Sequence, residues 1–111
     1  MLGARPQYLV LTDTDQHNIQ AAPGAGKAIE VLHIFASSDQ AAQTTLSIKE
    51  NTTTKYSLVL QISSQPVPVA LGESGWLLPE NTALTAQHSV DTANVYVTAL
   101  TRVVPSQVLQ S

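Results

Sequence analysis

The stretch closest to a known binding loop is Gly24-Ala25-Gly26-Lys27-Ala28. A phosphate-binding loop carries its first glycine five positions before the Gly-Lys pair, and a serine or threonine after the lysine to bind Mg²⁺. Here those two positions hold Ala21 and Ala28. The segment also leads into an apolar run that reads as a strand, so no helix N-terminus points at a phosphate. We therefore expect a tight turn ahead of a strand, and no bound cofactor.

Carboxylates are the second group that could do chemistry. Glycoside hydrolysis needs two carboxyl groups that face each other across a cleft, and the spacing of the glutamates fixes no such pair. Asp13 and Asp15 flank Thr14, but no glycine-punctuated loop with a downstream glutamate follows. A capped turn is therefore expected there instead of a calcium site. The glutamates considered are Glu30, Glu50, Glu73 and Glu80.

Three histidines, His17, His33 and His88, lie far apart, and none has a zinc-ligand spacing. His33 lies between Leu32 and Ile34, which favours a hydrogen-bonded histidine of the core or of an interface; a pH-sensitive contact is the alternative. The chain has no cysteine and no seryl nucleophile elbow. These residues predict no catalytic site and no metal site, and hence a protein that is not an enzyme.

Trp76 is the single tryptophan and follows a glycine-containing turn. A lone aromatic residue at such a place more often plugs one end of a sandwich core than binds a ligand. The core role is the prediction. The alternative is a carbohydrate-binding or receptor-binding module in which Trp76 and Tyr56 stack on a sugar.

Composition indicates one folded domain with few surface charges. Of its 111 residues, 43% are hydrophobic and 12% are charged, about half the usual charged share. The net charge is −3, and the five lysines and arginines are spread along the chain, so nucleic acid is not an expected partner. No apolar run approaches the ~20 residues of a membrane helix, and Met1–Leu11 does not resemble a signal peptide. We expect no membrane partner, and synthesis in a cytoplasm.

Hydrophobic patterning predicts a series of short strands. The apolar run Lys27–Ala36 is expected to form a central strand buried on both faces, with Asn94–Val104 beside it. Alternation in Thr44–Lys49 and Lys55–Ile62 predicts a β-hairpin with one solvated face. The remaining predicted strands are Tyr8–Leu11, His17–Ala22, Val67–Leu71 at an edge because of its prolines, Trp76–Leu78 and Asn81–His88.

Short strands separated by turn signals about every eight to twelve residues predict an all-β fold. We expect an antiparallel β-sandwich, jelly-roll-like or Ig-like, with about seven or eight short strands. The domain spans residues 1–111, with residues 1–7 as a loose N-terminal arm and residues 104–111 as a C-terminal tail.

The order of several short segments resembles small proteins encoded in the structural regions of tailed phages. A small-residue turn with Gly-Lys opens an apolar strand within Ala21–Leu32, and Gly75–Leu78 and Thr82–Ala86 follow downstream. Val95-Tyr96-Val97 closes the pattern, which covers about Ile19–Val103. The resemblance implies a jelly-roll-like or Ig-like virion component, often a trimer.

In particular, the resemblance implies a capsid cement (decoration) protein, or a head or tail accessory protein. Its expected partner is the major capsid protein, and its expected location is the virion, assembled in the host cytoplasm. Terminal segments could add a strand to a neighbouring protein, although Tyr8–Leu11 could equally be an ordinary outer strand. The expected partner-binding residues are Tyr8, Leu9, Val10, Leu11, Val104, Val108 and Leu109.

Overall fold

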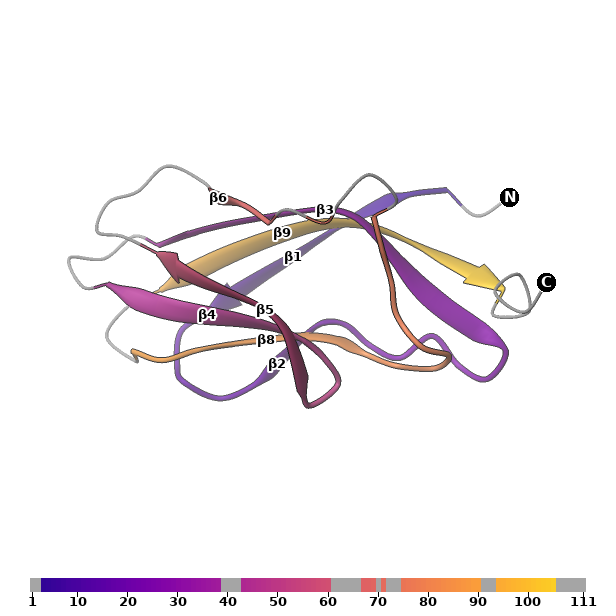
Figure 1. Ribbon diagram of the computed structural model, residues 1–111, viewed down its shortest axis with the longest axis horizontal. Helices are drawn as coiled ribbons and strands as arrows, with labels where there is room; N and C mark the ends of the chain where they lie inside the picture. Colours follow the sequence, from indigo (N-terminus) through magenta and orange to yellow (C-terminus); the bar gives the residue numbers. More distant parts are fainter. Residues whose placement is uncertain are drawn as a thin grey trace.

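The computed structural model describes residues 3–38, 43–60, 67–69, 71, 75–90 and 94–105. This part of the chain forms nine strands joined by turns (Figure 1), so the all-β prediction is confirmed. It has no helix of the length and apolarity needed to cross a membrane. The strands are β1 (Arg5–Leu11), β2 (His17–Gln20), β3 (Lys27–Ser38), β4 (Thr44–Glu50), β5 (Thr53–Leu60), β6 (Val67–Pro68), β7 (Trp76–Leu77), β8 (Leu84–His88) and β9 (Val95–Pro105).

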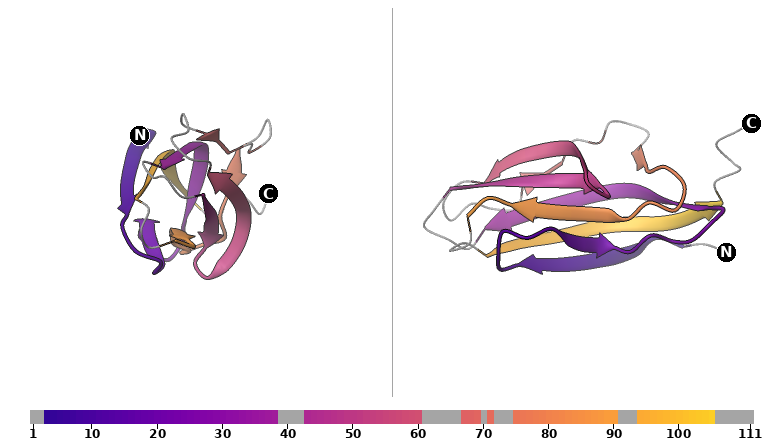
Figure 2. Two further views of the ribbon diagram at one scale, coloured as in Figure 1. Left: turned by 90° about the vertical axis from the view of Figure 1, so that its left-hand side faces the viewer. Right: turned by 90° about the horizontal axis from the view of Figure 1, so that it is seen from below.

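The strands form two antiparallel sheets that pack face to face as a sandwich (Figure 2). One sheet has the order β1-β9-β3-β6, with β7 also paired to β3, and the other has the order β2-β8-β4-β5. If β6 and β7 are counted as one interrupted strand, the first strand pairs with the last, the second with the next to last, and so inward to β4 and β5. A long antiparallel ribbon rolled up in this way is a jelly roll. Of the two sandwiches that the sequence predicts, jelly-roll-like or Ig-like, the strand pairing matches the first.

Strands β3 and β9 are the longest strands in the described residues and pair along almost their whole length, from Lys27↔Pro105 to Ser38↔Val95. The predicted neighbourhood of these two segments is therefore confirmed. The expectation that β3 is buried on both faces is wrong. Ile34 and Ala36 are buried, whereas Phe35 is 44% exposed. In a two-layer sandwich each sheet has one covered face, so alternate side chains of even the central strand reach solvent.

The predicted hairpin is confirmed as β4 and β5. Leu46 and Ile48 are fully buried, while Ser47 and Lys49 on the alternate face are partly exposed. Asn51 turns the chain with a φ of 55°, a conformation that asparagine tolerates better than most residues. The hairpin therefore supplies one side of the core and leaves a polar face outside. Predicted β5 residues beyond Leu60 lie outside the described part of the chain.

The boundaries expected at the two ends of the domain are wrong. Arg5, Pro6 and Gln7, expected in a loose arm, belong to β1 and pair with Thr101, Leu100 and Ala99 of β9. Val104, predicted both as the last residue of the strand Asn94–Val104 and as the first of the tail, lies in β9 opposite Ala28, and β9 continues to Pro105. Neither end shows the alternation of apolar and polar residues by which a strand is predicted from sequence. Each end is held in its sheet by pairing with a segment far away in the chain. Residues 1–2 and 106–111 lie outside the described residues.

The core lies between the sheets and draws on both of them. Its largest fully buried side chains come from all the longer strands and from the segment after β7. They include Leu11, Ile29, Val31, Ile34, Leu46, Ile48, Leu60, Leu78, Leu84, Val95 and Val97. Leu11 is thus part of the core rather than of a partner surface.

Candidate functional site

The glycine-rich turn before β3 is closed by the chain itself. Lys27 N donates to Gly24 O at 3.2 Å. Gly24 and Gly26 have positive φ values of 109° and 78°. Gly26 N donates to Glu80 Oε2 at 2.6 Å, and Gly24 N donates to Asn81 Oδ1 at 2.9 Å. A carboxylate and a carboxamide therefore occupy the amides that a phosphate would need. The prediction of a tight structural turn is confirmed.

Three of the four glutamates lie in the described residues, and each has a structural partner. Glu30 pairs with Arg102, Glu50 accepts from the Trp76 indole, and Glu80 accepts from Gly26 N. Glu73 lies outside the described residues. In the described ranges no group of three or more His, Asp or Glu side chains could hold a metal ion.

Asp13 caps the turn between β1 and β2, as predicted. Asp15 N donates to Asp13 Oδ1 at 2.9 Å, and His17 Nε2 donates to the same oxygen at 2.8 Å. The hydrogen bond from His17, followed by the one from the Asp15 backbone, lowers the pKa of the Asp13 carboxyl. This pair stabilises a surface turn, and no third His, Asp or Glu of the described residues joins it in a group that could hold a metal ion.

The other two histidines lie in different environments. His88 is buried, and its Nδ1 lies 3.1 Å from Thr44 Oγ1. His33 is exposed on β3 and stacks on Phe35 with 6.3 Å between ring centroids. The core alternative for His33 is therefore wrong, because its strand position faces away from the second sheet.

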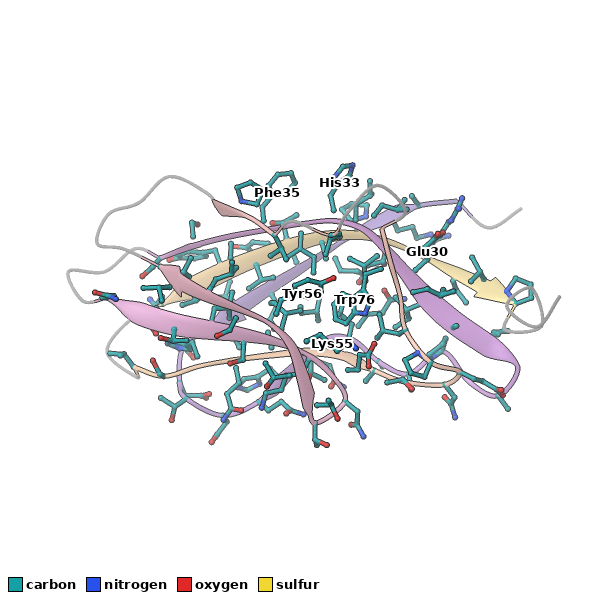
Figure 3. All side chains as sticks on the ribbon, viewed as in Figure 1. Glu30, His33, Phe35, Lys55, Tyr56 and Trp76 are labelled. Carbon is teal, nitrogen blue, oxygen red and sulfur yellow. The ribbon has the colours of Figure 1, made fainter. Side chains whose placement is uncertain are left out.

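The proposed sugar-stacking residues face the inside of the sandwich. Trp76 is 6% exposed, donates its indole N–H to Glu50 Oε2 at 2.9 Å, and meets Tyr56 edge to face at 5.1 Å. Figure 3 shows Tyr56 and Trp76 side by side between the sheets. Gly75 precedes Trp76 with a φ of 75°, and a Cβ there would lie 2.8 Å from Val31 O. The core role of Trp76 is confirmed, and its ring offers no face for a sugar.

The four N-terminal residues expected to bind a partner divide between two faces of β1. Leu11 is buried and Leu9 packs against the core, whereas Tyr8 and Val10 are 64% and 37% exposed. Of the expected C-terminal contacts, Val104 lies within β9. Val108 and Leu109 lie outside the described residues.

The exposed side of β1 continues across β9 and β3 as one surface. Tyr8 lies opposite Thr98, which lies opposite Phe35; Val10, Tyr96 and Ser37 form the next row, and Pro6, Leu100 and His33 the row on the other side. Figure 3 shows His33 and Phe35 pointing outward from β3. We call this surface, made of Tyr8, Val10, His33, Phe35, Tyr96, Thr98 and Leu100, the aromatic face.

The aromatic face carries no fixed charge along its three rows. Among the described residues of β3 and β9, the charged side chains on this side of the sheet include Glu30 and Arg102, which pair with each other and so neutralise one another. A hollow of about 420 Å³ opens on the face, lined by Phe35, Ala36, Ser37, Tyr96 and Thr98. The face therefore offers contact area and ring surfaces, with little electrostatic selectivity.

The outer face of the second sheet is different. Ser57, Ser47 and Gln87 lie opposite one another across β5, β4 and β8, and Thr45 lies one step along β4. Lys49 Nζ donates to the side-chain oxygens of Gln16 and Gln87 at 3.3 and 2.5 Å. We call the surface formed by Thr45, Ser47, Ser57 and Gln87 the hydroxyl face. It is well suited to water, apart from Val59 at its rim, which is 49% exposed.

The aromatic face is the feature that sequence reasoning missed. The sequence predicts Tyr8 and Val10 as partner-binding residues, but it places Phe35 in a strand buried on both faces and does not single out Tyr96 as a surface residue. The alternation of His33 and Phe35 with Ile34 and Ala36 was a usable signal. The register that brings Tyr8, Thr98 and Phe35 into one row was not readable from the sequence.

Comparisons with known proteins bear on the fold of this chain. No family model matches the chain, and no curated protein matches its sequence. Among solved structures, the chain is similar to a protein from work titled "Bacillus endospore appendages form a novel family of disulfide-linked pili". The TM-score is 0.51 at 10% sequence identity, over 95% of this chain and 90% of that one. This likeness supports the β-sandwich fold.

Proposed function

We propose that this protein is a non-enzymatic phage virion component, a capsid cement (decoration) protein. It binds the outer surface of the head and bridges major capsid subunits. The observation that carries the proposal is the aromatic face, where Tyr8 and Phe35 are 64% and 44% exposed on a surface without fixed charge. Contiguous apolar patches of this kind mark protein contact sites in soluble proteins.

The two outer faces set the orientation of the bound molecule. The aromatic face contacts the capsid, because burying its rings removes apolar area from water at no cost in charge desolvation. The hydroxyl face remains in solvent, because water can bond its serine and threonine hydroxyls, while the Gln87 side chain is bonded to Lys49 and Thr14 within the protein. The capsid surface under the aromatic face is correspondingly uncharged.

The size of the aromatic face favours a repeated assembly over a tight single contact. Three strands at about 4.8 Å and three same-face rows at about 6.8 Å give an area on the order of 300 Å². A stable pairwise interface needs about 800 Å² per partner. A homotrimer that presents three such faces to a regular shell gains the missing affinity by avidity. Neither nucleic acid nor a membrane is required.

A charge placed in the middle of the aromatic face tests the proposal. Thr98 is exposed at the centre of the middle row, so Thr98→Arg folds normally and puts an unpaired cation into the contact. Burying it costs several kcal/mol, so we expect retention on stripped capsids of the encoding phage to weaken at least about 100-fold. Ser47→Arg adds the same charge to the hydroxyl face and serves as the matched control.

The measurement is co-sedimentation of purified protein with capsids, together with the heat resistance of the decorated particles. Wild type and Ser47→Arg should bind and protect, and Thr98→Arg should do neither. Equal binding by both variants would remove the aromatic face from the contact. Absence of any binding by the wild type would remove the cement proposal itself.

A second candidate is a subunit of an extracellular appendage. It is favoured by the fold likeness to the endospore pilus protein. That protein is described as disulfide-linked, whereas this chain has no cysteine, so its copies would have to associate without covalent links. Electron microscopy of the concentrated protein separates the candidates: filaments support the appendage subunit, and discrete particles of uniform size oppose it.

A further inference from the structure

The core of the sandwich changes character at the end where β1 begins. Leu11, Leu9, Gln7 and Arg5 lie on the same, inward side of β1, because their partners in β9 are Val95, Val97, Ala99 and the buried Thr101. Going along this row, the side chains change from apolar to polar and then to charged. At this end of the sandwich, which we call its mouth, polar side chains take the place of the apolar ones that fill the core elsewhere.

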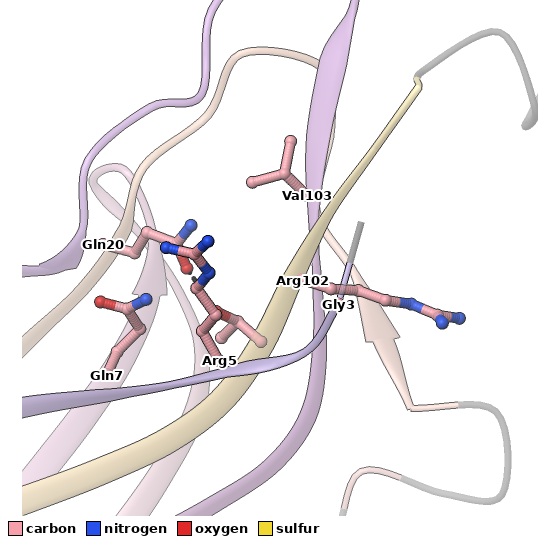
Figure 4. Close-up of a pocket in the computed structure, with 7 residues that line it drawn as sticks. Gly3, Arg5, Gln7, Gln20, Arg102 and Val103 are labelled. Carbon is pink, nitrogen blue, oxygen red and sulfur yellow. Dashed lines mark hydrogen bonds between the residues drawn. The ribbon is translucent and has the colours of Figure 1, made fainter. Parts of the chain in front are cut away.

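These polar side chains line a pocket of about 310 Å³ (Figure 4). Arg5, Gln7 and Gln20 point toward one another on one side of β9, while the Arg102 side chain extends to the opposite side, where it pairs with Glu30. No aspartate or glutamate is among the described residues that line the pocket. The Arg5 cation therefore faces the pocket without a carboxylate in its lining.

The orientation of Gln20 adds a second donor. Thr101 is 1% exposed, and its hydroxyl donates to Gln20 Oε1 at 2.5 Å. That bond fixes the carboxamide, so the Gln20 NH₂ group is directed away from Thr101, and Gln20 and Arg5 line the same pocket (Figure 4). Two neighbouring donors, one of them always charged, favour an acceptor that can accept from both.

We propose that this mouth of the sandwich is a binding site for a carboxylate. A planar guanidinium fork matches a carboxylate with two parallel hydrogen bonds, and the Gln20 amide supplies a third donor. Gln7 and Val103 form the remaining walls. The carboxylate comes from a free organic acid or from an acidic side chain of a neighbouring protein. This inference does not depend on the cement function, since the pocket lies at the end of the domain and not on the aromatic face.

Titration with succinate, followed by ¹H–¹⁵N NMR at neutral pH, tests the site. Succinamide is the neutral control of the same shape. We expect succinate at millimolar concentration to shift the resonances of the Gln20 side-chain amide and the Thr101 backbone amide, and succinamide to leave them unmoved. Arg5→Gln should weaken binding at least about tenfold, through loss of charge-assisted hydrogen bonds.

Two further variants separate a built site from general charge attraction. Lys55→Gln removes the same charge from β5, at the far edge of the second sheet, and should bind succinate as the wild type does. Gln20→Glu keeps an acceptor for Thr101 but places a carboxylate beside Arg5, so it should abolish binding. Identical shifts with succinamide, unchanged affinity in Arg5→Gln, equal losses in Arg5→Gln and Lys55→Gln, or no shifts at all would overturn the proposal.

A blocked peptide with a single glutamate distinguishes the two sources of the carboxylate. If the peptide binds more tightly than succinate, the site takes a side chain from a neighbouring protein. If succinate binds more tightly, the site takes a free acid. Either result requires the same dependence on Arg5.

Discussion

Trp76 joins the two sheets at the edge where β7 meets β5, and its truncation is the most informative single perturbation. The indole is 6% exposed, packs edge to face on Tyr56, and donates to Glu50 Oε2. It therefore combines buried area, an aromatic contact and a hydrogen bond to a carboxylate. Trp76→Ala removes all three, whereas Trp76→Phe keeps most of the buried ring and loses the hydrogen bond.

The expected cost of Trp76→Ala is about 3–5 kcal/mol, the usual range for a buried tryptophan. For a domain of this size that corresponds to a Tm roughly 12–30 °C lower. Trp76→Phe should cost about 1 kcal/mol, because Glu50 is only partly buried and water can replace the lost donor. Phe35→Ala, an aromatic truncation at a side chain that is 44% exposed, is the matched control and should cost well under 1 kcal/mol.

Thermal unfolding followed by circular dichroism measures these differences. Intrinsic fluorescence reports directly on the site, since Trp76 is the single tryptophan. Emission of the native protein should be blue-shifted and shielded from acrylamide. A native spectrum like that of the unfolded chain, or a Trp76→Ala variant as stable as Phe35→Ala, would refute the assignment of Trp76 to the core and reopen the sugar-stacking hypothesis.

Two further predictions test the ends and turns of the domain. Leu11 is fully buried, so Leu11→Ala should lower the free energy of unfolding by about 2–5 kcal/mol, measured by urea denaturation; a loss of capsid binding at unchanged stability would contradict its place in the core. The lowered pKa of Asp13 means that its hydrogen bonds to His17 and Asp15 stabilise the fold above the ordinary carboxyl pKa of 3.8, and that this contribution is lost as the pH falls toward the lowered value. In a ¹³C NMR titration the Asp13 midpoint should lie below 3.8 and should rise in His17→Ala; an identical midpoint in both proteins would show that His17 is not the cause.

Local sequence was sufficient for much of the fold. Alternation between Thr44 and Leu60 fixed the β4–β5 hairpin, because a side-chain period of two with a turn between is a local property. The apolar character of Lys27–Ala36 and Asn94–Val104 correctly indicated neighbouring long strands. Prolines and glycines marked the breaks, and the absence of a serine after Lys27 argued against a phosphate loop.

The functional candidates depended on information that no local pattern holds. Tyr8, Thr98 and Phe35 share one row only through the registers of β1 with β9 and of β9 with β3. The pocket at the mouth of the sandwich likewise needs Arg5 and Gln20, which belong to different sheets, to line one cavity together with Thr101. Each strand's sequence specifies which side chains alternate, but not which neighbour lies alongside.

Sequence by itself determined that this chain forms short antiparallel strands with a largely uncharged surface. Tertiary structure alone decided that the ribbon rolls into a jelly roll, that residues 5–7 extend β1 instead of forming an arm, and that one side of β3 faces solvent. The physical reason is that hydrophobic periodicity acts over a few residues. Register and sheet order are set by the free energy of packing two whole sheets together.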